Sequence, residues 1–453
     1  MVERTLVGSS HAEQAAPEAS KDRSFEAYAA ELDVLLAEQL DPSTRDTSAL
    51  RVPAELDGGA GAALRRLVSL EARRAQGAFF TPHALAAAAV EKLGSITAGS
   101  RAIDPACGAG DLLLAAARTL PLRPTLSETL RLWGECLAGL DQNESFVTVA
   151  KKRLALLALY RGAEPDTQML DGSFPGLGVG DGARWDVLGE PRAAVVLNPP
   201  FGVAQTPQGC GWSSGSVARA AVFAADVLER CGAGTRLVCI LPDVLRSGTR
   251  YGRWRGHIGA LADMESIDIV GRFDPHTNVD VFLLALIRRA ARTASGKSQQ
   301  WASIEADAPY AVGDLFLISV GAVVAYRSPL RGRWQRYLVA RGLSDEVIDA
   351  DQLPRRRFSG RLVTPPFVVV RRTSKPTRAA PRVLANVVTG KEPVAVENHL
   401  LVLEPKDGSR KTCERLTTVL RSRTATELLD ERIRCRHLTV AALCELPWDG
   451  GVG

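Results

Sequence analysis

Between residues 76 and 290, short apolar segments alternate with segments whose apolar residues recur at helical spacing. The apolar segments predict strands at 101–104, 136–140, 166–170, 193–197, 235–241, 265–270 and 281–288. The intervening segments predict helices at 83–93, 110–119, 143–160, 217–230 and 249–261. Such an alternation is typical of an open α/β sheet that is covered by helices on both faces.

The flanking parts of the chain differ in character. Residues 1–23 are small and polar, which predicts a disordered tail. A helical segment is expected over 24–75, with helices at 24–40 and 61–75. The α/β pattern defines a domain at 76–304. Residues 305–453 mix short apolar runs with Pro, Arg and Gly, and predict a separate α+β domain that ends in a helix at 431–447.

Composition excludes several classes of protein. No apolar stretch approaches the roughly 20 residues that span a bilayer, and residues 1–14 lack the apolar core of a signal peptide. We therefore expect a cytoplasmic protein without membrane contact. The eight cysteines form no C-x-x-C pair and the six histidines do not cluster with them, so we expect reduced thiols and no metal site.

A glycine-rich turn lies in RAIDPACGAGDLLLAAA, residues 101–117. Strand, tight turn and helix follow one another here, and in doubly wound sheets such a turn approaches a ligand closely. Asp104 and Asp111 flank the turn, and carboxylates would repel a pyrophosphate but attract an ammonium or sulfonium group. This favours S-adenosylmethionine as the cofactor. The alternative is a turn that only packs the helix on the strand.

Two further acids follow predicted strands. Asp141 in GLDQNESF could accept hydrogen bonds from both ribose hydroxyls. Asp171 in LDGSF could accept one from an adenine amino group. Each aspartate could instead cap the element that follows it.

The segment Asn198-Pro199-Pro200-Phe201 ends a predicted buried strand, where proline is a poor residue. An amide oxygen and a carbonyl in a rigid Pro-Pro unit provide two fixed acceptors, and an aromatic ring follows. These features suit a planar base with an exocyclic amine, such as adenine N6, and would favour the pyramidal amine that attacks a methyl donor. The alternative is a strand-ending turn with a packing phenylalanine.

The ordered motifs resemble the N6-adenine DNA methyltransferases of restriction-modification systems, in the group whose cofactor motif precedes NPP(Y/F). GAFFTP (77–82), DPACGAGDLL (104–113), GLDQN (139–143), NPPFG (198–202), CILPDVLRSG (239–248) and RFDPHTNVDVFLLALIRR (272–289) carry the resemblance over about 70–290. It implies a Rossmann-like S-adenosylmethionine-dependent methyltransferase sheet, followed by a domain that recognises the DNA target. Residues 202–217, rich in Gly and Ser, would be a mobile loop that closes over DNA after the base is rotated out.

The resemblance also implies roles for residues. The catalytic group would comprise Asn198, Pro199, Pro200 and Phe201. The cofactor would contact Phe80, Thr81, Pro82, Asp104, Ala106, Cys107, Gly108, Asp141, Gln142, Asp171, Gly172 and Asn198.

A basic region supports a DNA partner. Residues 327–382 contain fourteen Lys and Arg against four Asp and Glu, an excess of 14 − 4 = 10, whereas the whole chain carries +5. The candidates for DNA contact are Arg371, Arg372, Lys375 and Arg378, through phosphates rather than bases. A solvated surface is the alternative.

The expected activity is methylation of adenine N6 in duplex DNA within a restriction-modification or phage-defence system. A cognate restriction endonuclease or a defence-complex subunit is an expected partner. Two other readings remain open: methylation of RNA exocyclic amines or protein glutamine, and a catalytically inactive DNA-binding subunit of a defence complex.

Overall fold

The computed structural model describes residues 22–41, 43, 53–97, 99–166, 174–190, 193–291, 301, 308–343, 347–374, 381–434 and 437–448. The chain forms two compact units. The first comprises Met1–Gly202 with Arg230–Thr235, and the second comprises Val203–Glu229 with Arg236–Gly453. The predicted tail lies outside the described residues except for residues 22 and 23, which begin the first helix. No helix among the described residues is long and apolar enough to cross a membrane.

Four parallel strands form the sheet of the first unit, in the order β3-β2-β1-β4. They are β1 (Ala102–Asp104), β2 (Leu137–Asp141), β3 (Leu177–Val179) and β4 (Ala194–Leu197). On one side of β1 the sheet continues through β2 to β3, and on the other side β4 pairs with β1. The carboxyl end of β1 is therefore a topological switch point, where ligands bind in such sheets.

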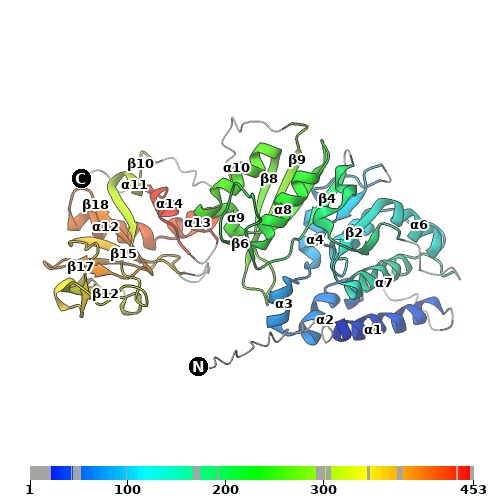
Figure 1. Cartoon of the computed structure of the whole chain (residues 1–453), viewed down its shortest axis with the longest axis horizontal. Helices are drawn as coiled ribbons and strands as arrows, with labels where there is room; N and C mark the ends of the chain where they lie inside the picture. Colours follow the sequence, from blue (N-terminus) through cyan, green and yellow to red (C-terminus); the bar gives the residue numbers. More distant parts are fainter. Residues whose placement is uncertain are drawn as a thin grey trace, which may run out of the picture. The chain divides into compact units, whose positions relative to one another are not determined.

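Among the described residues of this unit, seven helices accompany the sheet, and Figure 1 shows most of them. They are α1 (Asp22–Leu40), α2 (Gly59–Leu67), α3 (Leu70–Gln76), α4 (His83–Glu91), α5 (Asp111–Thr119), α6 (Leu126–Cys136) and α7 (Glu144–Tyr160). Short 3₁₀ turns lie at η1 (Ala54–Leu56), η2 (Gly182–Arg184) and η3 (Asp186–Gly189). Helix α1 packs along α7, because Phe25, Leu32 and Leu36 fall on one buried stripe.

The predicted helix at 61–75 is two helices. Val68 leaves the helical conformation, and the Ser69 hydroxyl accepts a hydrogen bond from the Ala72 N–H at 3.2 Å, which starts α3 anew. The predicted strand at 166–170 lies largely outside the described residues. Strand β3 and helix α6 were not predicted, although Leu126, Leu130 and Trp133 on α6 have helical spacing and are buried.

The second unit begins with the hairpin of β5 (Val203–Gln205) and β6 (Ser216–Ala218). The ends of the segment 202–217, expected to be a mobile loop, are thus paired as strands. Helices α8 (Arg219–Arg230), α9 (Asp243–Ser247) and α10 (Gly252–Leu261), with the 3₁₀ turn η4 (Thr249–Tyr251), accompany an antiparallel set of strands. These strands are β7 (Arg236–Pro242), β8 (Ala262–Arg272) and β9 (Asp280–Arg288), with β9 between the other two.

The remainder of the second unit is α+β. One sheet has the order β11-β18-β15-β16-β13, and a smaller one has the order β14-β12-β17. The strands are β11 (Phe316–Val320), β12 (Arg333–Leu338), β13 (Ile348–Asp349), β14 (Arg355–Phe358), β15 (Phe367–Arg371), β16 (Ala385–Thr389), β17 (Val394–Val396) and β18 (Leu400–Pro405), and a short pair joins β10 (Tyr310–Ala311) to β19 (Pro447–Trp448). The helices are α11 (Val312–Leu315), α12 (Arg410–Arg421), α13 (Arg423–Arg432) and α14 (Val440–Cys444), with 3₁₀ turns η5 (Ala340–Gly342) and η6 (Ala350–Gln352).

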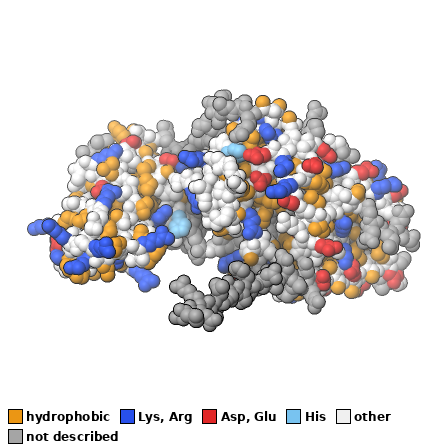
Figure 2. Space-filling view, viewed as in Figure 1, with side chains coloured by type: hydrophobic (Ala, Val, Ile, Leu, Met, Phe, Trp, Pro, Cys, Tyr) orange, Lys and Arg blue, Asp and Glu red, His pale blue; other side chains and the backbone are white. Residues whose placement is uncertain are grey.

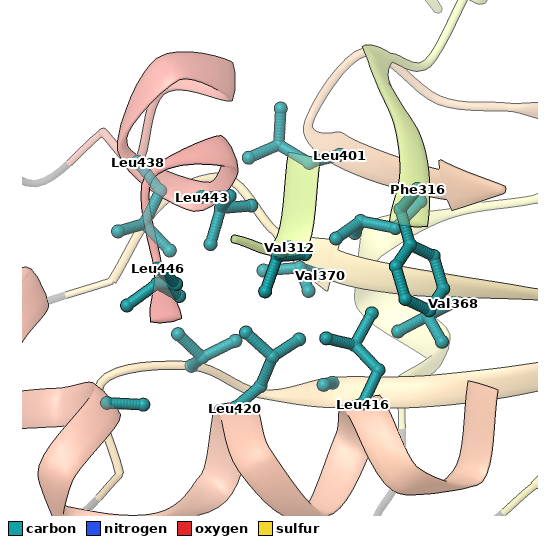
Figure 3. Packing of buried hydrophobic residues seen from close by; sticks show 14 of the residues in the cluster. Val312, Phe316, Val368, Val370, Leu401, Leu416, Leu420, Leu438, Leu443 and Leu446 are labelled. Atoms are coloured by element: carbon teal, nitrogen blue, oxygen red, sulfur yellow. The ribbon is translucent and has the colours of Figure 1, made fainter. Parts of the chain in front are cut away.

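Strand β15 has an apolar core on each face. Val368 and Val370 pack with Leu416 and Leu420 of α12 (Figure 3). Phe367 and Val369 face a second cluster, which includes Leu338 of β12. Successive residues of a strand point to opposite faces. Because both faces of β15 are buried, its apolar run is continuous rather than alternating.

The predicted helix at 431–447 was wrong. Helix α13 ends at Arg432 and α14 begins only at Val440. Ile433 has extended backbone angles, and the Leu438 N–H donates to the Arg372 carbonyl at 2.8 Å. Pairing with the residue that follows β15 replaces helical hydrogen bonds at this point.

Candidate active site at the carboxyl edge of the parallel strands

The turn between β1 and α5 brings backbone close to other side chains. Gly108 has a φ of +51° and Gly110 a φ of +83°. A Cβ on Gly108 would lie 2.9 Å from the Phe80 ring, and one on Gly110 would lie 2.9 Å from the Ala150 Cβ. Only glycine combines these backbone angles with such close packing.

Two carboxyl groups lie at the ends of β1 and β2. Asp104 is 1 % exposed, and one carboxyl oxygen accepts the Ala106 N–H at 3.1 Å. The pKa of Asp104 is raised to about 8, mainly by burial; the backbone hydrogen bond from Ala106 lowers it, and the nearby Asp141 and Asp111 carboxylates raise it. Asp141 accepts the Gly108 N–H at 3.0 Å and the Asn143 N–H at 2.9 Å, and burial raises its pKa too.

Arg153 on α7 contacts the glycine turn, and it was not among the residues predicted from the sequence. Its guanidinium lies 2.9 Å from the Asp111 carboxylate and donates to the Ala109 carbonyl at 2.6 Å. It also donates to the Glu55 carbonyl at 2.8 Å. The side chain is 1 % exposed. The sequence did carry a signal for this residue, because an arginine within the apolar part of a buried helix needs polar partners.

The segments GAFFTP and NPPF, far apart in sequence, lie together. The Asn198 amide nitrogen donates to the Phe79 carbonyl at 3.1 Å and to the Thr81 hydroxyl at 2.9 Å. Because a carbonyl can only accept, this pairing fixes which end of the amide is nitrogen. The Asn198 Oδ1 atom is buried and has no hydrogen-bond partner among the described residues. The site therefore contains an oriented acceptor with no donor supplied by the described chain.

Aromatic rings hold the same segments together. The Phe201 ring stacks on the Phe79 ring, with centroids 5.9 Å apart, and Phe201 is 5 % exposed. The Phe201 N–H donates to the Gly77 carbonyl at 3.3 Å. Phe80 packs edge-on against Phe25 of α1 and Phe146 of α7. The N-terminal helix thus helps to position the residue that covers the glycine turn.

A pocket opens at this edge of the sheet. Its lining comprises Phe79, Phe80, Thr81, Asp104, Ala106, Cys107, Gly108, Asp111, Leu112 and Asn198. Seven of the predicted cofactor residues are therefore gathered around one cavity: Phe80, Thr81, Asp104, Ala106, Cys107, Gly108 and Asn198. Pro82, Asp141 and Gln142 are outside the lining, and Asp171 and Gly172 fall outside the described residues.

The predicted DNA contacts lie in the second unit. Arg371 ends β15, and the Arg372 N–H donates to the His399 carbonyl at 2.9 Å. Both side chains are partly buried. Lys375 and Arg378 fall outside the described residues, so the DNA contacts of this turn stay a prediction.

Comparisons with known proteins agree with this architecture. Residues 63–209 match the family model of the N-6 DNA methylases. No curated protein matches the sequence. The type IIL restriction-modification enzyme MmeI, solved with DNA, is similar over 94 % of this chain and 82 % of its own length, with 11 % identity and a TM-score of 0.52. This similarity concerns the fold and includes the C-terminal α+β part.

Two further solved structures are similar to parts of the chain. The modification subunit of a candidate type I restriction enzyme from Vibrio vulnificus YJ016 has 17 % identity over 52 % of this chain, with a TM-score of 0.35. The chain spans 50 % of the length of that protein. A candidate class I S-adenosylmethionine-dependent methyltransferase from Listeria monocytogenes has 15 % identity over 63 % of this chain and 91 % of its own, with a TM-score of 0.38. The family match covers the parallel strands, the glycine turn and the NPPF segment, so residues 63–209 are similar to the N-6 DNA methylases.

Proposed function

We propose that the chain is a site-specific DNA methyltransferase that transfers a methyl group from S-adenosylmethionine to N6 of a flipped-out adenine in duplex DNA. The observation that carries the proposal is the buried Asn198 Oδ1 atom, which lacks a partner while its amide nitrogen is held by Phe79 and Thr81. Such an acceptor suits an N–H donor that arrives with a substrate.

The residues of the pocket fit the cofactor. Asp104 is buried and pairs with no cation among the described residues, and burial is the main cause of its raised pKa. Arg153 neutralises Asp111 instead. Asp104 and the Gly108 turn would hold the cationic amino acid end, with Phe80 and Thr81 beside it, and Asp141 would accept from the ribose. The cofactor supplies an electrophilic methyl group on a sulfonium.

The chain's own residues would activate the amine. Asn198 Oδ1 and the Pro199 carbonyl each accept one N–H of the adenine amino group, which localises the nitrogen lone pair toward the methyl donor. Asn198 also lines the cofactor pocket, so it holds the amine within reach of that donor. In the proposed complex Phe201 stacks on the extruded base. Rotating the base out of the duplex costs a few kcal/mol.

The proposal extends to the setting of the enzyme. It acts in the cytoplasm on double-stranded DNA, as part of a restriction-modification or phage-defence system with a cognate endonuclease or a defence-complex subunit. The domains would be catalytic at 76–304 and target-recognising at 305–453, after the helical segment 24–75. The basic composition of 327–382 supports a DNA-binding role for the last domain.

Transfer of radiolabelled methyl groups tests the substrate class. The purified full chain is incubated with labelled S-adenosylmethionine and, separately, with duplex DNA, RNA and a protein translation release factor. Label in DNA alone is the expected result. Label in RNA or in protein glutamine would overturn the proposal, and cofactor binding without any transfer would point to an inactive DNA-binding subunit.

A further inference from the structure

An exposed tryptophan lies on the small sheet of the second unit. Strands β12 and β14 are antiparallel, and Trp334 is directly opposite Arg357. The Arg357 guanidinium lies over the Trp334 ring, 5.8 Å from its centroid. Trp334 is 59 % exposed. A large aromatic ring that stays in water while an arginine stacks on it is an unusual use of tryptophan in a stable fold.

The arginines around this ring fall into two groups. Arg336 and Arg355 both bind Glu392, with nitrogen–oxygen distances of 2.7 Å. Arg331, Arg333 and Arg357 are exposed and form no ion pair with a carboxylate among the described residues. The first group therefore holds the sheet together, and the second leaves positive charge available to a ligand.

A second aromatic–arginine pair lies in the segment that leads into β12. Arg327 lies 5.5 Å from the centroid of the Tyr326 ring, and Tyr326 is 77 % exposed. Figure 2 shows Lys and Arg side chains gathered with apolar ones at the end of the second unit, where Figure 1 labels β12 and β17. Interleaved arginines and exposed aromatic rings are a feature of surfaces that bind nucleic acids.

We propose that Trp334 and Arg357, which share one face of the sheet, form a phosphate-binding ribbon for the backbone of duplex DNA. The Trp334 face holds the Arg357 guanidinium flat, which leaves the N–H groups at its edge free to donate to phosphate oxygens. Arg333 precedes Trp334 on β12, so its side chain lies on the other face of the sheet, and Arg331 precedes the strand. Both add positive charge near the ribbon without belonging to it. The choice of duplex DNA as the ligand rests on the proposed function.

This ribbon differs from the basic turn that the sequence emphasised. Arg371 and Arg372 are partly buried and follow a core strand, whereas Trp334 and Arg357 are exposed. The ribbon would fix the position of the duplex on the protein rather than read bases, because phosphate contacts carry no sequence information directly.

Binding of a fluorescent 30-base-pair duplex to the full chain, measured by anisotropy from low to moderate salt, tests the ribbon. The Trp334→Ala/Arg357→Ala variant should bind at least about tenfold more weakly. Each lost phosphate contact should reduce the slope of log K against log salt by about 0.9, so the loss of Arg357 in this variant should reduce it by one step. Trp334→Phe should retain most of the affinity, since it keeps a ring under the guanidinium.

The matched control is Arg423→Ala on α13. This side chain is 92 % exposed, and among the described residues its ion pair is with Glu427 four residues away. Its loss therefore changes the net charge of the same unit equally. It should leave affinity and salt slope at the wild-type values. Thermal melting of each variant reports folding. Equal losses of affinity in Arg423→Ala and in Trp334→Ala/Arg357→Ala would show that only net charge matters and would overturn the proposal.

The outcomes separate the ribbon from the catalytic proposal. If the wild-type chain methylates DNA but the ribbon variants bind with unchanged affinity and slope, the ribbon is wrong and the enzyme assignment stands. If binding depends on Trp334 and Arg357 but no methyl group is transferred, the ribbon stands and the enzyme assignment fails. A wild-type chain that binds no duplex overturns the ribbon.

Discussion

The side-chain nitrogen of Asn198 lies 2.9 Å from the Thr81 hydroxyl oxygen, across 117 residues of sequence. The same nitrogen donates to the Phe79 carbonyl. Together these acceptors turn the amide oxygen away from both partners and leave it as the free acceptor of the site. The entry segment GAFFTP therefore orients the amide of the NPPF segment, in addition to lining the pocket.

Thr81→Val should lower kcat for DNA methylation by about five- to tenfold. The variant keeps the shape of threonine but removes one acceptor, and a neutral hydrogen bond is worth about 1 kcal/mol. The Asn198 amide would then rotate more freely and lose its fixed oxygen. Thr81→Ser keeps the hydroxyl and should restore most of the rate, measured by steady-state methylation of a plasmid. A serine variant as slow as the valine variant would contradict the orienting role.

Arg153→Met should weaken S-adenosylmethionine binding and lower stability. It leaves the Asp111 carboxylate, 10 % exposed, without its cation, and breaking a buried ion pair costs about 3–5 kcal/mol. It also releases the Ala109 carbonyl of the glycine turn. Calorimetric titration with the cofactor and urea unfolding measure the two effects.

Arg161→Met is the matched control for Arg153. Arg161 caps the C-terminal end of the same helix and donates to the Ala117 and Leu120 carbonyls at the end of α5, away from the pocket lining. It should reduce stability but leave the cofactor dissociation constant near that of the wild type. If both variants weaken the cofactor equally, Arg153 is a structural residue without a specific effect on the turn.

Asp104 should make the ligand-free protein less stable as the pH rises. The folded pKa of about 8 exceeds the ordinary aspartate value of 3.8, so the folded state binds a proton that the unfolded state has released. The resulting stability is fully present below pH 3.8 and is lost as the pH rises through 8. Urea unfolding between pH 5 and 9 should reveal this decline against Asp104→Asn, which has no titrating carboxyl at this position.

Cofactor binding should reverse the protonation of Asp104. A cationic ligand favours the carboxylate, so binding at pH 7 should release a proton from the wild type and fewer from Asp104→Asn. Calorimetry in two buffers of different ionisation enthalpy counts these protons. Identical proton release in both proteins would place the cationic end of the cofactor elsewhere.

The sequence predicted those parts of the fold that depend on local pattern. Strands β1, β2, β4, β7, β8 and β9 follow apolar runs, and seven predicted cofactor residues line one pocket. Local pattern could not reveal Arg153, because its partners Asp111, Ala109 and Glu55 come from distant segments. The helix predicted at 431–447 failed for the same reason, since the Leu438 N–H pairs with a distant carbonyl.

Nucleoside mass spectrometry of methylated DNA tests the central claim most directly. Duplex DNA is incubated with S-adenosylmethionine and either the wild type or Asn198→Ala, then digested to nucleosides, while calorimetry records cofactor binding by both proteins. The account predicts N6-methyladenine from the wild type, none from Asn198→Ala, and cofactor binding by both. Wild-type turnover by Asn198→Ala, or N4-methylcytosine as the wild-type product, would contradict it.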